Sequence, residues 1–406
     1  MGYALREVEV LEPLPAVQLA ADQEGVGLVV RRAGRPVGFA LQPLPRGTRL
    51  EPSDVDLIVG RACAETLVRE AVLDELGREA PTTDASFTVA VCTRARPVLL
   101  ARLLHSVHVS VERSGLPRPE LLVVDNAPPD DATRRAVAGL PDVRYVVEPL
   151  AGLDFARNRA LHEATGDVVA FLDDDVVVDG GWYAELRQLW AEHPDAGGAT
   201  GQVLPFELAT GAQVAFEQYG GFRRPWVAAR YAGTSLPGNP LFPYGAGMFG
   251  AGCNMSYRRV AVLELGGFDE ALDTGRPLPG GGDLDMFSRV IRGGHPLVYS
   301  PQYLVFHQHR RTEAELRHQL FTWGTGHMAY VGKTWRAEPA ARPVLVRLVR
   351  WQVRRMVRQV AKAALGRSDV PIAHTLAELR GSVVGLSGSY ARSVRRTEAV
   401  RAAAAA

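Results

Sequence analysis

Residues 171–182 read FLDDDVVVDGGW, and this stretch decides the fold. The apolar run 168–172 has the length of a strand buried on both faces. Asp173, Asp174 and Asp175 follow it without a break. Neighbouring carboxylates repel one another and lose hydration, and a cation such as Mg²⁺ or Mn²⁺ offsets both costs while it holds substrate phosphates. We therefore predict a metal site here; the alternative is a solvated acidic loop that caps the next helix.

Strand and helix patterns alternate on both sides of this stretch. The expected strands are 87–92, 121–124, 144–147 and 168–172, and the expected helices are 97–112, a short one from Asp131, and 153–165. Such alternation implies an α/β fold with a Rossmann-like, mostly parallel sheet and helices on both faces. Ligands bind such sheets at the carboxyl ends of the strands. Thr93-Arg94, Asp125-Asn126 and the aspartate triplet all fall at those ends, so we expect one binding site there.

The regions before and after the α/β pattern differ from it in character. Residues 1–82 have a hairpin signal at Ala33-Gly34-Arg35 and helical spacing over 61–76, which predicts a small β-rich module with one helix. Residues 78–86, REAPTTDAS, are polar and contain proline, as linkers do. We expect the α/β domain at 86–330 and a basic helical region at 331–406.

The composition narrows the class of protein. The chain has 406 residues, 47% apolar and 22% charged, which excludes a largely disordered protein. Its apolar stretches are strand-sized, short of the roughly 18 residues that span a bilayer. The N-terminus, MGYALREVEV, is charged where a signal peptide has its apolar run. Three cysteines lie far apart, against a disulfide framework or a cysteine zinc site, so we expect a reducing, cytoplasmic location.

Charge is distributed unevenly along the chain. From residue 330 onward there are 15 Lys and Arg against 4 Asp and Glu, a balance of +11, whereas the preceding part has a balance of −10. Residues 344–365 have an amphipathic helical pattern. Its apolar face would carry Leu345, Val349, Val353, Met356, Val360 and Ala364, and its basic face Arg347, Arg350, Arg354, Arg358 and Lys362. Three interpretations stay open: a solvated helix packed on the preceding domain, a helix on an anionic membrane surface, and a nucleic-acid contact, of which we do not expect the last.

Several segments together resemble the family 2 glycosyltransferases, which have the GT-A fold. VAVCTRARP (89–97) resembles the family's first strand and turn, and LLVVDNAPPDDAT (121–133) its second strand. GLDFARNRAL (152–161) resembles the segment G-x-x-x-A-R-N-x-G, with Ala160 in place of the usual glycine. The aspartate triplet resembles the metal-binding motif, and GAGCNMSYRR (250–259) and LGGFDEAL (265–272) resemble the acceptor-side loop and its turn. The resemblance covers about 87–330.

The resemblance implies roles for residues on the donor side. Asp125 would contact the nucleotide base, Asp173 or Asp174 the ribose, and Asp175, with Asp173 or Asp174 assisting, the metal. We expect Thr93, Arg94 and Arg96 to line the donor site, and Arg157 to neutralise a phosphate or hold Asp173. Some GT-A enzymes use a late histidine as a metal ligand, and His307 in the run His-Gln-His is the candidate. For Asp125 a turn-forming role, for Arg157 a surface position and for His307 a structural role stay open.

The second carboxylate cluster, PGGGDLDMFSR (279–289), would supply the general base. Family 2 enzymes usually have Glu-Asp here, and the aspartate deprotonates the acceptor hydroxyl. In this chain Gly282 stands at the glutamate position and Asp283 matches the aspartate. Asp283 is therefore the expected base, with Asp285 second; the alternative for Asp283 is an N-cap of the helix that follows.

Taken together, the residues and the resemblance predict a metal-dependent, inverting glycosyltransferase. Its donor would be a UDP-, GDP- or dTDP-linked sugar, its cofactor Mn²⁺ or Mg²⁺, and its acceptor a hydroxyl in a cell-envelope glycan, glycolipid or secondary metabolite. The basic tail favours a lipid-linked acceptor at the inner face of the cell membrane. Two rivals remain: an inactive relative that binds a nucleotide sugar or carbohydrate, and a nucleotidyltransferase, which usually has a Gly-rich loop where residues 93–97 have no glycine.

Overall fold

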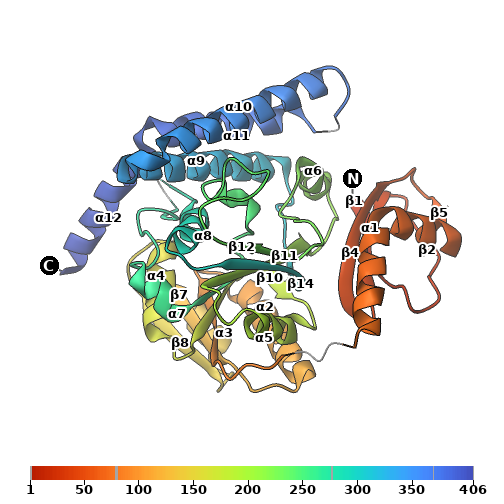
Figure 1. The fold of residues 1–406 in the computed structure, drawn as a ribbon, viewed down its shortest axis with the longest axis horizontal. Coiled ribbons are helices and arrows are strands. Elements are labelled where there is room, and N and C mark those ends of the chain that lie inside the picture. The colour runs from red at the N-terminus through yellow and green to blue at the C-terminus, as the bar shows by residue number, and fades with distance from the viewer. Residues whose placement is uncertain (1, 78–80, 276–277, 369, 406) are drawn as a thin grey trace.

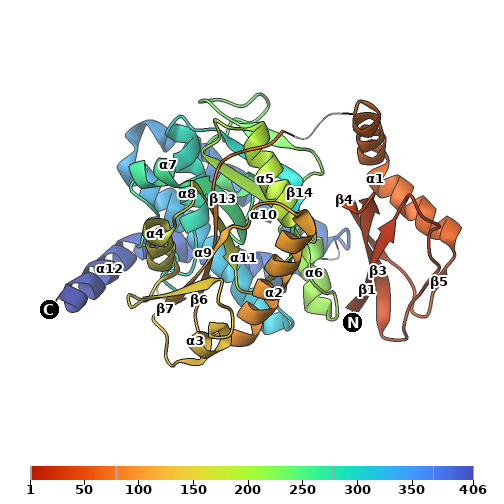
Figure 2. The same ribbon diagram turned by 90° about the horizontal axis from the view of Figure 1, so that it is seen from below.

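The computed structural model describes residues 2–77, 81–275, 278–368 and 370–405. A small N-terminal sheet lies at one end of the molecule, the large sheet is in the middle, and α12 (Tyr390–Ala405) projects from the other end (Figures 1 and 2). The helices α9, α10 and α11 lie across the large domain (Figure 1).

The N-terminal module is built on a three-stranded sheet in the order β1-β3-β4. Its strands are β1 (Gly2–Glu9), β3 (Gln23–Arg32) and β4 (Arg35–Pro43), with β2 (Val17–Gln18) and β5 (Arg49–Leu50) paired beside them. The expected hairpin is present, and Ala33 and Gly34 at its turn both have positive φ. Helix α1 (Pro52–Glu75) begins nine residues before the predicted 61–76, because Glu51 and Asp54 form a capping box.

One half of the large sheet is parallel, as the alternating pattern predicted. Its strands lie in the order β8-β7-β6-β9, all parallel. They are β6 (Phe87–Thr93), β7 (Glu120–Asn126), β8 (Val143–Glu148) and β9 (Val168–Asp173), connected by α2 (Pro97–Ser114), α3 (Ala132–Val137) and α4 (Leu153–Glu163). Buried side chains from α2 and α5 pack on one face and those from α4 and α8 on the other, which confirms the α/β class with helices on both faces.

The other half of the sheet is mixed. It continues from β9 through β13 (Asn254–Arg258), β11 (Gly198–Pro205), β14 (Leu297–His307) and β10 (Val176–Val178), with β12 (Ala229–Tyr231) also paired to β14. Only the β11–β14 pair in this half is parallel. The register sets Val176 opposite His307, so the end of β14 lies beside the aspartate triplet. The remaining helices of the domain are α5 (Trp182–Glu192), α6 (Gly211–Tyr219), α7 (Arg259–Glu264) and α8 (Gly282–Arg292).

The C-terminal helices pack against the large domain and against one another. They are α9 (Glu313–Ala337), α10 (Arg342–Ala364) and α11 (Ile372–Val384), which precede α12. Helix α9 is capped at its start by Thr312 and Glu315 and runs on to Ala337. The expected domain boundary at 330/331 therefore falls inside this helix. Helices α9 and α11 approach closely, because a Cβ at Gly381 would lie 1.9 Å from the Phe321 carbonyl oxygen. Among the helices the structure describes, none is long and apolar enough to cross a membrane.

The buried stripe of α10 differs from the predicted apolar face. It consists of Leu345, Leu348, Gln352 and Met356, whereas Val353 is 46% exposed. The reason is that the Gln352 side chain donates a 2.6 Å hydrogen bond to Glu378 of α11. A polar residue that finds a buried partner can face the interior, and the helix is rotated accordingly.

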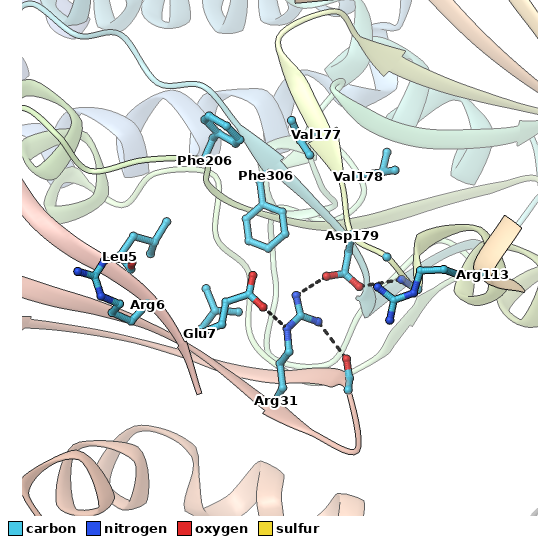
Figure 3. A pocket seen from close by; sticks show the side chains of 14 residues that line it. Leu5, Arg6, Glu7, Arg31, Arg113, Val177, Val178, Asp179, Phe206 and Phe306 are labelled. Atoms are coloured by element: carbon cyan, nitrogen blue, oxygen red, sulfur yellow. Dashed lines mark hydrogen bonds and ion pairs between the residues drawn. The ribbon is translucent and has the colours of Figure 1, made fainter. Parts of the chain in front are cut away.

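The N-terminal module contacts the large domain through apolar side chains and one buried ion pair. Tyr3, Val29 and Phe39 pack with Leu204, Leu208, Val214 and Leu304. A pocket of about 560 Å³ lies beside this contact, between β1, β3 and the residues that follow β10 (Figure 3). At its floor Arg31 donates a 2.5 Å hydrogen bond to Asp179 and a 2.7 Å hydrogen bond to Glu7. Because Asp179 is buried, Arg31 compensates its charge from the neighbouring module.

We expect Arg31→Met to destabilise the protein by about 3 kcal/mol, because it leaves the Asp179 carboxylate buried without its cation. Urea unfolding measures this. The matched control is Arg46→Met, because the Arg46–Glu24 ion pair is about half exposed on both sides and such pairs contribute about 0–1 kcal/mol. Equal losses in the two variants would contradict a special role for the buried pair.

Candidate active site

A cleft of about 730 Å³ opens at the carboxyl ends of the parallel strands. It is lined by the turn after β6, the start of α4, the aspartate triplet, the loop before α8, the end of β14 and one face of α9. Nine of the predicted site residues line the cleft: Thr93, Arg94, Arg96, Arg157, Asp173, Asp174, Asp175, Asp283 and His307. The fold thus brings together residues as far apart in sequence as Thr93 and His307.

The three aspartates have different surroundings. Asp173 ends β9 and its side chain is 37% exposed, whereas Asp174 and Asp175 are buried. Both oxygens of Asp174 are engaged: Thr93 donates to one at 2.7 Å and Arg96 to the other at 2.9 Å. Asp174 therefore fastens the triplet to the turn after β6. Asp173 is partly exposed to the cleft but is still surrounded by protein, and this partial loss of hydration raises its pKa, since it disfavours the charged carboxylate.

Asp175 is the aspartate closest to the histidine. His307 Nε2 lies 3.3 Å from its Oδ1, and Arg310 Nη1 lies 3.9 Å from its Oδ2. Burial would raise the pKa of Asp175, but His307, Arg310 and Arg96 outweigh that effect and hold the pKa below its usual range. His309 holds His307 in place: the Nδ1 atoms of the two rings lie 3.2 Å apart. The Nε2 atom of His309 in turn lies 2.8 Å from Glu217 Oε1. Asp175 is thus ionised within a ring of cationic and imidazole groups.

The donor set at this edge fits a divalent cation that draws part of its coordination from a ligand. Within the described residues, no group of three His, Cys, Asp or Glu side chains converges as a complete metal site. Asp173, Asp175 and His307 nevertheless supply hard oxygen and imidazole donors at one end of the cleft. Mg²⁺ and similar ions are typically held by one or two carboxylates together with substrate phosphates, so an incomplete protein shell is the expected form.

Arg157 lies inside the protein beside the triplet. Helix α4 begins after Gly152, and the Arg157 side chain, 4% exposed, donates to Asp154 at 2.9 Å and to Asp273 at 3.0 Å. Its Nη2 lies 4.0 Å from Asp173 Oδ1. The surface position that the sequence left open is therefore wrong. Asp154 and Asp273 were not among the predicted site residues. For Asp154, the available signal was an acidic residue inside the segment GLDFARNRAL (152–161).

Asp283 faces the cleft near the start of α8. Its Oδ2 accepts a 3.1 Å hydrogen bond from the Gly252 backbone N–H. Gly281, with φ of 107°, is the N-cap of α8, so the alternative role of Asp283 as N-cap is wrong. Asp285 is a different case: it is buried, and its Oδ2 lies 2.7 Å from both Arg289 and Lys333. The structure places Asp285 outside the cleft lining, in a structural ion-pair cluster, and this corrects the expectation that it is a second base candidate.

Two donor-side candidates lie at the margins of the cleft. Arg94 is exposed and lines it. Asp125 is fully buried at the end of β7, where Tyr145 donates to its Oδ2 at 2.8 Å, while Oδ1 has no hydrogen-bond partner among the described residues. The neighbouring Asn126, rather than Asp125, lines the cleft. The unpartnered Oδ1 is an acceptor available to a ligand only if the surrounding side chains shift.

Known proteins match the same part of the chain. Residues 88–266 match the family described as Glycosyl transferase family 2. The succinoglycan biosynthesis protein ExoM of Rhizobium meliloti is 29% identical over 256 residues, which cover 61% of this chain and 75% of that protein. A glucosyl-dolichyl phosphate glucuronosyltransferase of Haloferax volcanii is 30% identical over 128 residues, which cover 31% of this chain and 36% of that protein. This second match spans about a third of its relative's length.

A solved structure also resembles the chain at the level of overall shape. The mannosyltransferase PcManGT from Pyrobaculum calidifontis, in complex with GDP-Man and Mn²⁺, superposes with a TM-score of 0.47 at 19% identity and covers 84% of this chain and 93% of its own. The segment matched in sequence, by contrast, contains the turn after β6, the Arg157 helix and the whole aspartate triplet, so sequence and geometry identify the same site. Residues 88–266 thus match glycosyltransferase family 2, and the chain is a glycosyltransferase with an α/β fold.

Proposed function

We propose that this glycosyltransferase is metal-dependent and inverting, and that it transfers a sugar from a nucleoside-diphosphate donor to an acceptor hydroxyl. The observation that carries the proposal is that the aspartate triplet and Asp283 line one cleft, with the Arg157 guanidinium next to Asp173. The end of the cleft at the aspartate triplet therefore suits a metal-bound diphosphate. The Asp283 carboxylate is available separately to accept a proton. Glycan biosynthesis is supported by the name of the relative ExoM.

The proposed reaction is a single displacement. The Asp283 carboxylate accepts the proton of the acceptor hydroxyl, whose oxygen attacks the anomeric carbon while the bond to the diphosphate breaks on the opposite side. Arg94, Arg96 and Arg310 offer positive charge to the departing diphosphate. When bound by Asp173, Asp175 and His307, Mn²⁺ or Mg²⁺ would stabilise the negative charge of that leaving group. Asp125 remains our candidate for the nucleotide base, and inversion follows from attack on the opposite side.

We further propose that the protein works at the inner face of the cell membrane on a lipid-linked acceptor. On α10 the five cationic side chains of the predicted basic face pair with no carboxylate in the described part of the chain; they are Arg347, Arg350, Arg354, Arg358 and Lys362. Beside them Trp351 is 50% and Val357 62% exposed. A basic face flanked by exposed apolar groups is typical of helices that lie on anionic lipid. The relative named for glucosyl-dolichyl phosphate supports a lipid-linked acceptor.

The metal proposal predicts a cation-dependent thermal shift. We expect Mn²⁺ with UDP, GDP or dTDP to raise the Tm, by an amount equivalent to about 2.7 kcal/mol when ligand is about 100 times its Kd. Asp175→Asn should abolish the Mn²⁺-dependent part. Asp195→Asn, an exposed carboxylate outside the cleft that pairs with Arg230, is the control and should keep it. An undiminished shift in Asp175→Asn would contradict the proposed ligand set.

The reaction itself is tested by a panel of UDP-, GDP- and dTDP-sugars with Mn²⁺, read as released nucleoside diphosphate. We expect one donor to be consumed. Once an acceptor is found, NMR of the product should show that the anomeric configuration is inverted relative to the donor. Asp283→Asn should lower kcat by at least about 100-fold, as expected for loss of a general base. Asp195→Asn, an exposed carboxylate paired with Arg230, is the control that should leave turnover unchanged. No release from any donor, with no nucleotide-induced shift, would favour an inactive binding relative.

The membrane proposal predicts binding to anionic vesicles. At low salt we expect the protein to pellet with vesicles of equal phosphatidylcholine and phosphatidylglycerol but not with phosphatidylcholine alone. Reversing Arg350, Arg354 and Arg358 to Glu should abolish pelleting, since each basic residue near such a surface contributes about 1 kcal/mol. Reversal of Arg46, Arg49 and Arg61 in the N-terminal module changes the net charge equally and should leave it intact. Equal loss of pelleting in both triple variants would show that binding depends on net charge alone and would contradict a specific role for α10.

A further inference from the structure

The space at Gly282 is filled by two carboxylates from other parts of the chain. A Cβ at this position would lie 2.1 Å from Asp154 Oδ2 and 2.5 Å from Asp273 Oδ2. Gly282 is the first residue of α8, and its φ lies outside the left-handed region, unlike that of Gly281 at 107°. The backbone would therefore accept a side chain at 282, and what excludes one is the pair of carboxylates.

Asp154 is an unusual residue to find in this position. It is fully buried in the first turn of α4, and its Oδ1 accepts a hydrogen bond from Arg157. Its Oδ2 has no hydrogen-bond partner within the described residues and points into the space at Gly282. Burial, and then the nearby Asp273, raise the pKa of Asp154 well above its usual range. A buried carboxylate oxygen without a hydrogen-bond partner is energetically unfavourable, so its presence here points to a role for this side chain.

Asp273 connects the same space to the base. Its Oδ2 accepts from Arg157 and, at 3.0 Å, from the Gly282 backbone N–H, one residue before Asp283. The Asp273 carbonyl accepts a 2.9 Å hydrogen bond from Leu153 N–H at the start of α4. Arg157 and Asp283 also flank Gly252. A Cβ at Gly252 would lie 3.2 Å from both Arg157 Nη2 and Asp283 Oδ2. The start of α4, the start of α8 and Arg157 are thus fastened together at one point.

We propose that Asp154 and Asp273 are positioning residues for Asp283. From α4 and from the loop before α8 they fill the space in which the resemblance expects a glutamate, and they hold Arg157 and the first turn of α8 in place. The carboxylate missing at 282 has thereby been replaced by one from a different segment of the chain. This inference rests on the proposed function, in which Asp283 is the base.

A double-mutant cycle tests the replacement directly, with Asp154→Ala, Gly282→Glu and the two combined. Gly282→Glu alone must displace Asp154, and Asp154→Ala alone leaves Arg157 short of a partner, so we expect each to lower kcat at least about tenfold with donor KM nearly unchanged. The combined variant puts the carboxylate back from position 282 into the space that Asp154 vacates, and the end of the Asp273 side chain, 2.5 Å from the new Cβ, must still turn aside. We expect it to recover to within about threefold of the wild-type kcat and to melt above both single variants. Gly280→Ala is the steric control for the loop and should keep its Tm, because its Cβ would meet nothing closer than 3.7 Å.

Recovery of kcat in the combined variant supports the proposal when Asp154→Ala with Gly282→Gln, which fills the same space without a carboxylate, does not recover. Additive losses in both kcat and Tm would overturn it. If the wild type consumes no donor at all, the proposed function fails separately, and the Tm cycle still decides the inference: a combined variant more stable than both singles supports the replacement, and an additive one refutes it.

Discussion

Compensation of buried negative charge is the constraint on which the rest of the site depends. Asp154, Asp173, Asp174, Asp175 and Asp273 are gathered around one cleft, and a buried carboxylate costs several kcal/mol unless it is paired. The compensating groups come from separate elements: Arg96 from the turn after β6, Arg157 from α4, and His307 and Arg310 from the end of β14. The strand order that brings those elements together is therefore also what makes the acidic cleft stable. A cation and a diphosphate would add to this balance rather than create it.

The mixed half of the sheet completes a site that the parallel half begins. Strands β6 and β9 deliver Thr93 and the triplet, as in any Rossmann-like sheet. Strand β14 runs beside β11 and pairs with β10, and this register sets His307 next to Asp175. Both His307 and Asp283 lie beyond residues 88–266, the segment that matches the family. In the proposed reaction, the C-terminal third of the chain thus supplies reacting groups as well as packing.

Local sequence was sufficient to predict the strands of the parallel half, the helix that carries Arg157 and the cluster at the strand ends. It was insufficient where a residue's environment is made by distant segments. Asp285 and Asp283 are two positions apart and equally acidic, and only the tertiary contact of Asp285 with Lys333 separates their roles. Gln352 was not part of the predicted apolar face, yet its side chain is buried because it donates a hydrogen bond to Glu378 of α11. In the same way Gly282 suggested a lost carboxylate, because no local pattern shows that Asp154 occupies its place.

The C-terminal helices form part of the wall of the active site. The loop before α8 lies directly on the α9 backbone, since a Cβ at Gly326 would be 2.7 Å from the Gly280 carbonyl carbon. Helix α11 packs on α9 at Gly324 and Gly381, and α10 is joined to α11 by the hydrogen bond from Gln352 to Glu378. Close packing of this kind leaves little room for sliding. The basic face of α10 therefore has a fixed position relative to Asp283. Under the proposed function, a membrane bound by that face would lie at a set distance from Asp283, which is the arrangement required if the acceptor hydroxyl is presented from the same surface.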